Sequence, residues 1–134
     1  MMKSMLIVLT MTVAASFAVA EEAPKPDLVT IVTNKEKEKL VADSSGSTLY
    51  VFDVDQGKPV PACNGTCAEI WPPYLITDAE AATLKAPLGA IKRANEKIQL
   101  TYEGRPVYLY AYDRGVADEA GDGIGGVWHY IEIQ

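Results

Sequence analysis

The segment GSTLYVFDVD (residues 46–55) recurs 58 positions later as GRPVYLYAYD (residues 104–113). Both copies obey the pattern Y-x-[FY]-x-x-D, and a tryptophan follows the aspartate of each copy by 15 or 16 residues. These landmarks are Tyr50, Phe52, Asp55 and Trp71 in the first copy, and Tyr108, Tyr110, Asp113 and Trp128 in the second. Four landmarks matched in the same order indicate an internal repeat, which has to be recognised before a fold is assigned.

Each copy is predicted to form a β-hairpin. A first strand at 39–42 or 97–102 leads into a turn closed by Gly46 or Gly104, and a second strand ends at the motif aspartate. The two-residue period of a strand puts the motif aromatic side chains on one face and aliphatic side chains on the other. Because both faces are apolar, we expect these strands inside a sandwich or barrel. The tyrosine hydroxyls should then reach polar partners at the rim, and the aspartates should accept backbone N–H groups.

The rest of the chain predicts further strands at 28–33, 88–93 and 126–133, and one short helix between the copies. A capping box opens this helix, with Glu80 three residues after Thr77, and Pro87 ends it. The charged run 34–39 is predicted to be a solvated turn. The sequence therefore predicts a mainly β fold with one core. Residues 28–134 should form a single small sandwich-like or barrel-like domain, whose two hairpin repeats (about 38–76 and 96–133) pack about a pseudo-twofold axis.

The N-terminal residues are typical of an export signal. Lys3 is followed by an uncharged apolar run, and the small residues Ala18 and Ala20 flank Val19 ahead of Glu21. This pattern predicts a signal peptide at 1–20, cleaved after Ala20, followed by an extended leader at 21–27. The apolar run is shorter than the roughly 18–20 residues that a spanning helix needs, and no cysteine follows the cleavage point. We therefore expect an unlipidated periplasmic or secreted protein that does not insert into a membrane after cleavage.

Charge narrows the possible partners. The chain carries 12 Lys plus Arg against 18 Asp plus Glu. Cleavage of the predicted signal peptide would remove one of these cations, Lys3, and all four methionines. A net negative charge of this size disfavours nucleic acid and anionic membrane surfaces as partners. The expected partner is an envelope protein or a glycan, and the oligomeric state stays open.

The two cysteines lie close together, in CNGTC at 63–67. In an exported protein they are expected to form a disulfide bond that shapes this loop, since closing so short a ring contributes only about 2 kcal/mol. The alternative is a Cu(I) site formed by Cys63, Cys67 and His129, which is the single histidine of the chain. A thiol–disulfide oxidoreductase would have C-x-x-C spacing instead.

The segment 113–125 is rich in aspartate and glycine. Asp113, Asp118, Glu119 and Asp122 supply hard oxygen atoms that suit calcium, although the spacing is not that of an EF-hand and such residues also build ordinary turns. No other cofactor is predicted. The seven tyrosines and two tryptophans either fill a core or line a ligand cleft, and their strand periodicity favours the core. No catalytic residue is predicted, because the chain has neither a G-x-S-x-G motif nor a nucleophile spaced to meet its histidine.

The segments TLYVFDVD, CNGTCAEIWPP, LTYEGRPVYLYAYD and GDGIGGVWHY resemble a bacterial secreted-repeat family, described as predicted lipoproteins with a Yx(FWY)xxD motif. The resemblance covers roughly residues 38–133 and implies a secreted or periplasmic protein whose biochemical role is undefined. This chain departs from the lipoprotein description because it lacks the lipid-attachment cysteine. The sequence thus favours an exported, non-enzymatic binding or structural module, and its alternative is a periplasmic protein that handles copper or calcium.

Overall fold

The computed structural model describes residues 10–15 and 27–134. The predicted signal peptide and leader lie outside the described residues, apart from 10–15 and 27. Within the described part of the chain, no helix is long and apolar enough to cross a membrane. The chain forms, in order, β1 (Val29–Thr33), β2 (Lys39–Asp43), β3 (Tyr50–Phe52), α1 (Thr66–Ile70), β4 (Leu75–Ile76), α2 (Asp78–Ala81), β5 (Leu88–Lys92), β6 (Ile98–Tyr102), β7 (Arg105–Tyr108), β8 (Trp128–Tyr130) and β9 (Glu132–Ile133).

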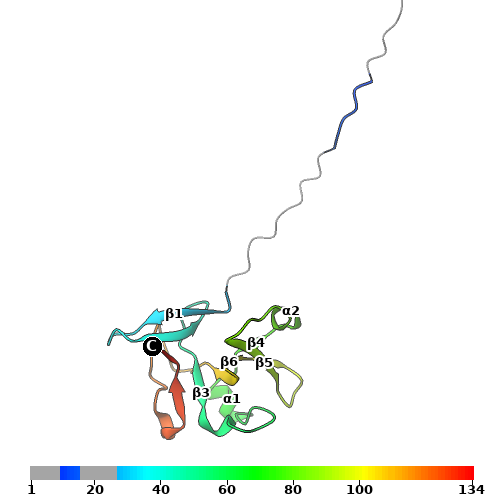
Figure 1. Ribbon diagram of the computed structural model, residues 1–134. Coiled ribbons are helices and arrows are strands. Elements are labelled where there is room, and N and C mark those ends of the chain that lie inside the picture. The colour runs from blue at the N-terminus through cyan, green and yellow to red at the C-terminus, as the bar shows by residue number, and fades with distance from the viewer. Residues whose placement is uncertain (1–9, 16–26) are drawn as a thin grey trace, which may run out of the picture.

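The two repeats exchange their last strands. In the first repeat β1 pairs with β2, and in the second β5 pairs with β6 in the same way. The last strand of each repeat then joins the hairpin of the other repeat, because β9 pairs with β2 and β4 pairs with β6. Figure 1 shows the red C-terminal end beside the cyan β1 strand, on the side of the molecule away from α2. Each repeat is therefore completed by the other.

A local twofold axis passes between β3 and β7. These two strands are antiparallel, and the equivalent tyrosines Tyr50 and Tyr108 face each other in the register. Two equivalent strands that pair antiparallel, with equivalent residues opposite each other, are related by a rotation of half a turn. The same rotation therefore relates one repeat to the other. The fold is mainly β and small, as predicted, and its two repeats are arranged about a pseudo-twofold axis.

Two buried clusters lie on the two faces of the central strands, where one core was expected. Aliphatic side chains form the first, with Val41, Leu49, Val51, Leu100 and Val107. Aromatic side chains and one cysteine form the second, with Tyr50, Cys63, Trp71, Tyr108 and Trp128. The alternation of aromatic and aliphatic residues along β3 and β7 produces this division, because neighbouring side chains point to opposite faces of a strand. The prediction that aromatic side chains lie on one face of these strands and aliphatic side chains on the other is confirmed. Each face has a buried cluster of its own.

The secondary structure differs from the prediction in its helices and strand ends. Two short α-helices occur in the described residues, where one was predicted. The capping box forms, with Thr77 Oγ1 accepting from the Glu80 amide at 3.1 Å, but α2 ends at Ala81, well before Pro87. The additional helix α1 begins inside the cysteine loop. The motif aspartates also lie beyond the strands, since β3 ends at Phe52 and a 3-10 turn spans Asp53–Asp55.

Candidate functional site

Each motif tyrosine donates its hydroxyl to the motif aspartate of the other repeat. Tyr50 Oη lies 2.7 Å from Asp113 Oδ2, and Tyr108 Oη lies 2.7 Å from Asp55 Oδ2. The second oxygen of each aspartate accepts a backbone N–H seven residues further on. Ala62 donates to Asp55 at 2.7 Å, and Ala120 donates to Asp113 at 3.1 Å. Each copy has a long loop between its motif aspartate and its tryptophan. The motif therefore fixes the start of this loop against the opposite repeat.

Four aromatic rings form a continuous stack across the twofold axis. Its members, in order, are Phe52, Trp128, Trp71 and Tyr110, with centroid separations of 4.2, 3.9 and 4.3 Å. The two repeats alternate along the stack, and the central tryptophan rings are parallel within 1°. Tyr50 and Tyr108 pack edge-on against the tryptophans at 5.4 and 5.1 Å. Aromatic rings contribute large buried areas, so this stack is a main source of the stability that holds the loops in place.

The stack also explains a glycine in the second loop. A Cβ atom at Gly121 would lie 2.6 Å from Trp71 Cη2, which is closer than any side chain permits. The Gly121 amide donates to Tyr50 Oη at 3.3 Å. The loop thus passes directly over the tryptophan ring, and only glycine leaves room for this approach.

Burial and the paired aspartates hold the tyrosines in their neutral form. Desolvation raises the pKa of the Tyr50 hydroxyl far above its ordinary value, and the neighbouring Asp113 raises it further. Burial and Asp55 act on the pKa of Tyr108 in the same way. Burial also raises the pKa of the Asp113 carboxyl, against the lowering effect of its hydrogen bonds with Tyr50 and Ala120. At neutral pH the tyrosines therefore remain hydrogen-bond donors.

These shifts predict a loss of stability at alkaline pH. The folded pKa of Tyr50 and of Tyr108 lies above the unfolded value of about 10, so their contribution is complete below pH 10 and declines as the pH rises past it. We expect the free energy of unfolding, measured by urea titration from about pH 8 to about pH 11, to fall with a slope that Tyr50→Phe reduces. The part of the tyrosinate absorbance that Tyr50→Phe removes should appear together with unfolding. A slope that is the same in Tyr50→Phe would contradict this assignment.

The hairpin turns of both repeats reach into the long loop of the other repeat. Asn34, which follows β1, is only 7% exposed and donates through Nδ2 to Glu38 and Glu119, at 2.8 Å each. Arg93, which follows β5, is 4% exposed and donates to the Cys63 carbonyl and to Asn64 Oδ1. The run 34–39, predicted to be a solvated turn, is therefore anchored at its first residue, while Lys35, Glu36 and Lys37 are exposed.

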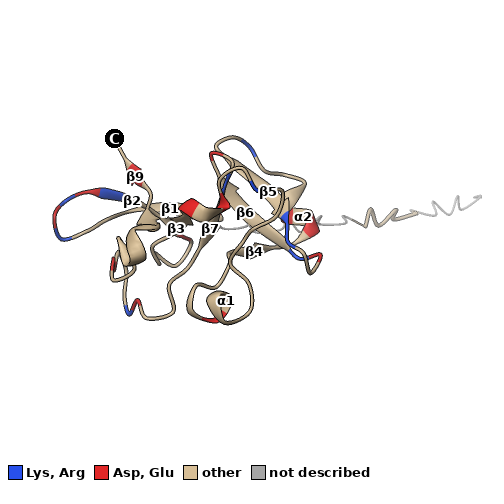
Figure 2. Ribbon diagram, turned by 90° about the horizontal axis from the view of Figure 1, so that it is seen from below, with Lys and Arg blue, Asp and Glu red and all other residues tan. Residues whose placement is uncertain are grey.

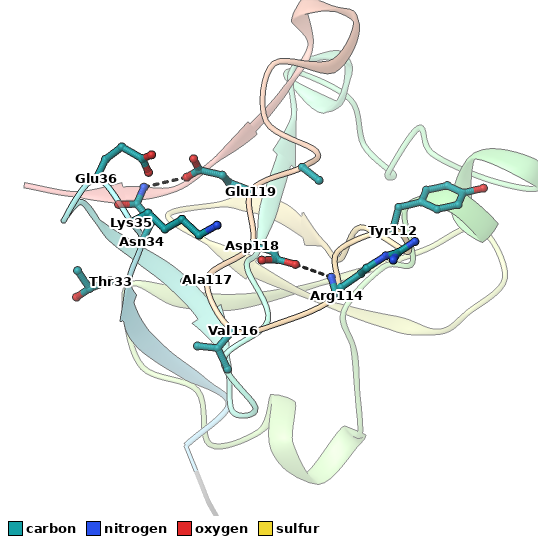
Figure 3. Close-up of a pocket in the computed structure, with 11 residues that line it drawn as sticks. Thr33, Asn34, Lys35, Glu36, Tyr112, Arg114, Val116, Ala117, Asp118 and Glu119 are labelled. Carbon is teal, nitrogen blue, oxygen red and sulfur yellow. Dashed lines mark hydrogen bonds between the residues drawn. The ribbon is translucent and has the colours of Figure 1, made fainter.

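The contact between Asn34 and Glu119 closes one end of a cleft. The cleft has a volume of about 640 Å³ and lies between the β1–β2 turn and the 112–120 loop. Figure 3 shows Asn34, Lys35 and Glu36 on one side and Tyr112 with Arg114 on the other. The turn is also visible in Figure 2, where basic and acidic segments alternate beside β2. Charged groups of both signs thus line a single opening.

The cleft also has apolar and aromatic surface. The Tyr112 side chain is 65% exposed, and its ring lies edge-on at 5.5 Å from Tyr110, the last ring of the stack. Val116 is 67% exposed in the same loop. Tyr50 and Tyr108, by contrast, are fully buried. Tyr50 and Tyr108 thus belong to the core, whereas Tyr112 lines the cleft and packs against the end of the stack.

The predicted copper ligands are not brought together. Cys63 and Cys67 form a disulfide bond, and Cys63 is fully buried in the aromatic cluster. His129 lies in β8, where its Nε2 is 2.8 Å from Asp53 Oδ2. Within residues 10–15 and 27–134, no group of three or more His, Cys, Asp or Glu side chains is placed to hold a metal ion.

The predicted calcium ligands hold the second loop through hydrogen bonds. Asp118 Oδ2 accepts from the Arg114 and Gly115 amides at 2.7 and 2.8 Å, and Asp122 Oδ1 accepts from the Tyr130 amide at 3.2 Å. Asp113 is occupied by Tyr50 and Ala120, as described above. These contacts are the turn-building role that aspartates often have.

Sequence reasoning did not identify the cleft residues Lys35, Glu36, Tyr112 and Arg114, nor the buried Arg93. A usable signal existed for Arg93, through its match with Asn34. Asn34 and Arg93 occupy matching positions after β1 and β5, and the side chain of each donates to a residue of the other repeat. The backbone carbonyl of each also accepts the N–H of the residue three positions further on, Lys37 or Glu96. A repeat alignment extended upstream would have shown that both turns begin with a hydrogen-bonding side chain.

Comparison with known proteins gives one family match. The model of a family described as "Secreted repeat of unknown function" matches residues 30–74 and again residues 89–132. Both matches begin upstream of the predicted repeats and include all but the first residue of β1 and of β5. No curated protein and no solved structure matches the chain.

Proposed function

The chain belongs to a family of secreted repeats of unknown function, and from this premise we propose that it is a non-catalytic module that binds an envelope glycan in the 640 Å³ cleft. The observation that carries the proposal is the exposed Tyr112 ring beside charged side chains of both signs. Sugar rings present C–H groups that pack on aromatic faces and hydroxyls that pair with charged donors and acceptors.

Three charged side chains of the cleft are available to a ligand. Among the described residues, no hydrogen bond or ion pair engages the charged groups of Lys35, Glu36 and Arg114. Glu119, in contrast, already accepts from Asn34. The hydroxyls of a neutral ligand can hydrogen-bond to the cations and to the anion together. A strongly charged ligand would be repelled by the side chains of its own sign. This balance favours a glycan over a charged peptide.

The same proposal includes the location of the mature protein. We place it in the periplasm, released by cleavage after Ala20 and without a lipid anchor, because the residue after the cleavage point is Glu21. Intact mass and N-terminal sequencing of the exported protein measure this directly, and a retained N-terminus or an added lipid mass would overturn it.

Binding to envelope glycan fragments tests the function. We expect Tyr112→Ala to weaken binding of the fragments about five- to tenfold, the value of one aromatic contact, and Tyr112→Phe to preserve it. Lys92→Gln is the matched control, because Lys92 is exposed and is absent from the cleft lining. Microscale thermophoresis against glycan fragments and against unmodified peptides supplies the comparison. Unchanged binding by Tyr112→Ala, or binding of the peptides alone, would refute the proposal.

A further inference from the structure

We propose that the chain has a second, independent ligand site, which takes a small carboxylate joined to a compact apolar group. The site is a cavity of about 250 Å³ between the segment that follows β3 and the β6–β7 turn. It shares no lining residue with the 640 Å³ cleft. Its volume is slightly below the roughly 300–1,000 Å³ of drug-sized ligand pockets, which limits the occupant to a small molecule or one side chain.

The floor of this cavity is apolar. Four of its lining residues are hydrophobic or aromatic: Phe52, Val60, Ile91 and Pro106. Phe52 is the end of the aromatic stack and is held rigidly against Trp128, and Val60 is 41% exposed. A preformed apolar floor with few polar groups at its rim is the usual plan of a small-molecule site.

The rim carries two cations that have no partner. Lys58 and Arg105 line the cavity, both are exposed, and no ion pair or side-chain hydrogen bond engages either of them among the described residues. In a chain with an excess of acidic residues, two unpaired cations at one opening attract an anion. Arginine in addition offers a planar pair of N–H donors that fits a carboxylate.

The two acidic residues of the lining are already engaged. Asp55 uses one oxygen for Tyr108 and the other for the Ala62 amide, and Asp53 lies 2.8 Å from His129. Asp55 therefore has no free oxygen to pair with Lys58 or Arg105, and Asp53 is paired through Oδ2 with His129. Lys58 and Arg105 are thus the charged side chains of this lining that have no side-chain partner among the described residues.

The equivalent opening in the other repeat has one cation, Arg114, where this one has two. A shift of 58 residues places Val116 where Lys58 stands and Ser47 where Arg105 stands. The same shift places Asp118 where Val60 stands. Before the hairpin turn the shift is 59, and Val32 is the equivalent of Ile91. Of these two equivalent openings, only the one beside β3 therefore carries two unpaired cations, because Val116 and Ser47 replace Lys58 and Arg105 in the other.

Titration of the 15N-labelled mature protein with 3-phenylpropionate tests the site, with its amide and the equal-sized 3-phenylpropylamine as neutral and cationic comparisons. We expect the carboxylate to shift the Gly57 and Gly104 amide signals and to bind about tenfold more tightly than the amide, the effect of one charge-assisted hydrogen bond. Raising the salt concentration from about 50 to about 500 mM should weaken it, since exposed cations are screened.

Substitutions separate this site from the glycan cleft. Lys58→Gln and Arg105→Gln should each weaken the carboxylate about three- to tenfold, while Lys92→Gln and Tyr112→Ala leave it unchanged. The proposal fails if the amine binds as tightly as the carboxylate, if no shift occurs at about 10 mM ligand, or if the Lys58→Gln, Arg105→Gln double variant binds normally. The Tyr112→Ala result also shows which of the two sites a failure concerns.

Discussion

Replacing Asp55 with alanine is expected to lower the free energy of unfolding by about 3–5 kcal/mol, out of the roughly 5–15 kcal/mol typical of a domain. Asp55 is only 7% exposed and accepts both the Tyr108 hydroxyl and the Ala62 amide. Its removal leaves two donors without a partner, one of them on a fully buried tyrosine. Each such orphan costs about 1–3 kcal/mol.

The control for this substitution is two residues away. Asp53 has a side chain that is 42% exposed, and its one side-chain hydrogen bond among the described residues is with His129, so Asp53→Ala should cost less than about 1 kcal/mol. Urea unfolding of both variants, of Tyr108→Phe alone, and of each aspartate variant combined with Tyr108→Phe completes a double-mutant cycle. We expect Asp55→Ala to cost at least about 1 kcal/mol less once the Tyr108 hydroxyl is absent. Equal losses of unfolding free energy in Asp55→Ala and Asp53→Ala would show that the hydrogen bond between Tyr108 and Asp55 does not stabilise the fold.

Trp71→Ala is expected to have an effect of similar size, about 3–5 kcal/mol. Trp71 is 5% exposed and contacts Trp128, Tyr110 and Tyr50 in the stack, so alanine leaves a cavity at the centre of the aromatic cluster. The parallel tryptophan pair should also give a strong near-ultraviolet circular dichroism signal, which the variant loses.

Tyr112→Ala is the matched comparison at the exposed end of the same cluster. It should change the unfolding free energy by less than about 0.5 kcal/mol and preserve the near-ultraviolet signal. If Trp71→Ala unfolds at the same urea concentration as the original protein, the stack does not support the loops, and the rigid placement of Tyr112 loses its basis.

The sequence was sufficient to predict the repeat, the β-rich class and the two apolar faces of the central strands. All three depend on local patterns, namely the spacing of the motif residues and the alternation along Tyr50–Phe52. The match of the family model to two ranges agrees with the repeat. The capping box at Thr77 was equally local, and it formed.

The exchange between repeats could not be predicted in the same way. A repeat establishes that two segments fold alike, but it does not show which copy a side chain contacts. The motif could be interpreted as a tyrosine and a capping aspartate within one copy, whereas the structure places each tyrosine on the aspartate of the other. The cleft was missed for a related reason, because its two walls come from segments about 80 residues apart that no local pattern connects.

The crossed tyrosine–aspartate pairs and exchanged last strands mean that a single copy of the motif is an unfinished protein. Alone it would expose a tyrosine without an acceptor, an aspartate without a donor and a hairpin edge without its closing strand. A second copy corrects all three defects at once, whether it is on the same polypeptide or another. The chain is thus comparable to a dimer of two similar subunits that are joined covalently. The segment that contains α2 links them, so their association does not depend on protein concentration.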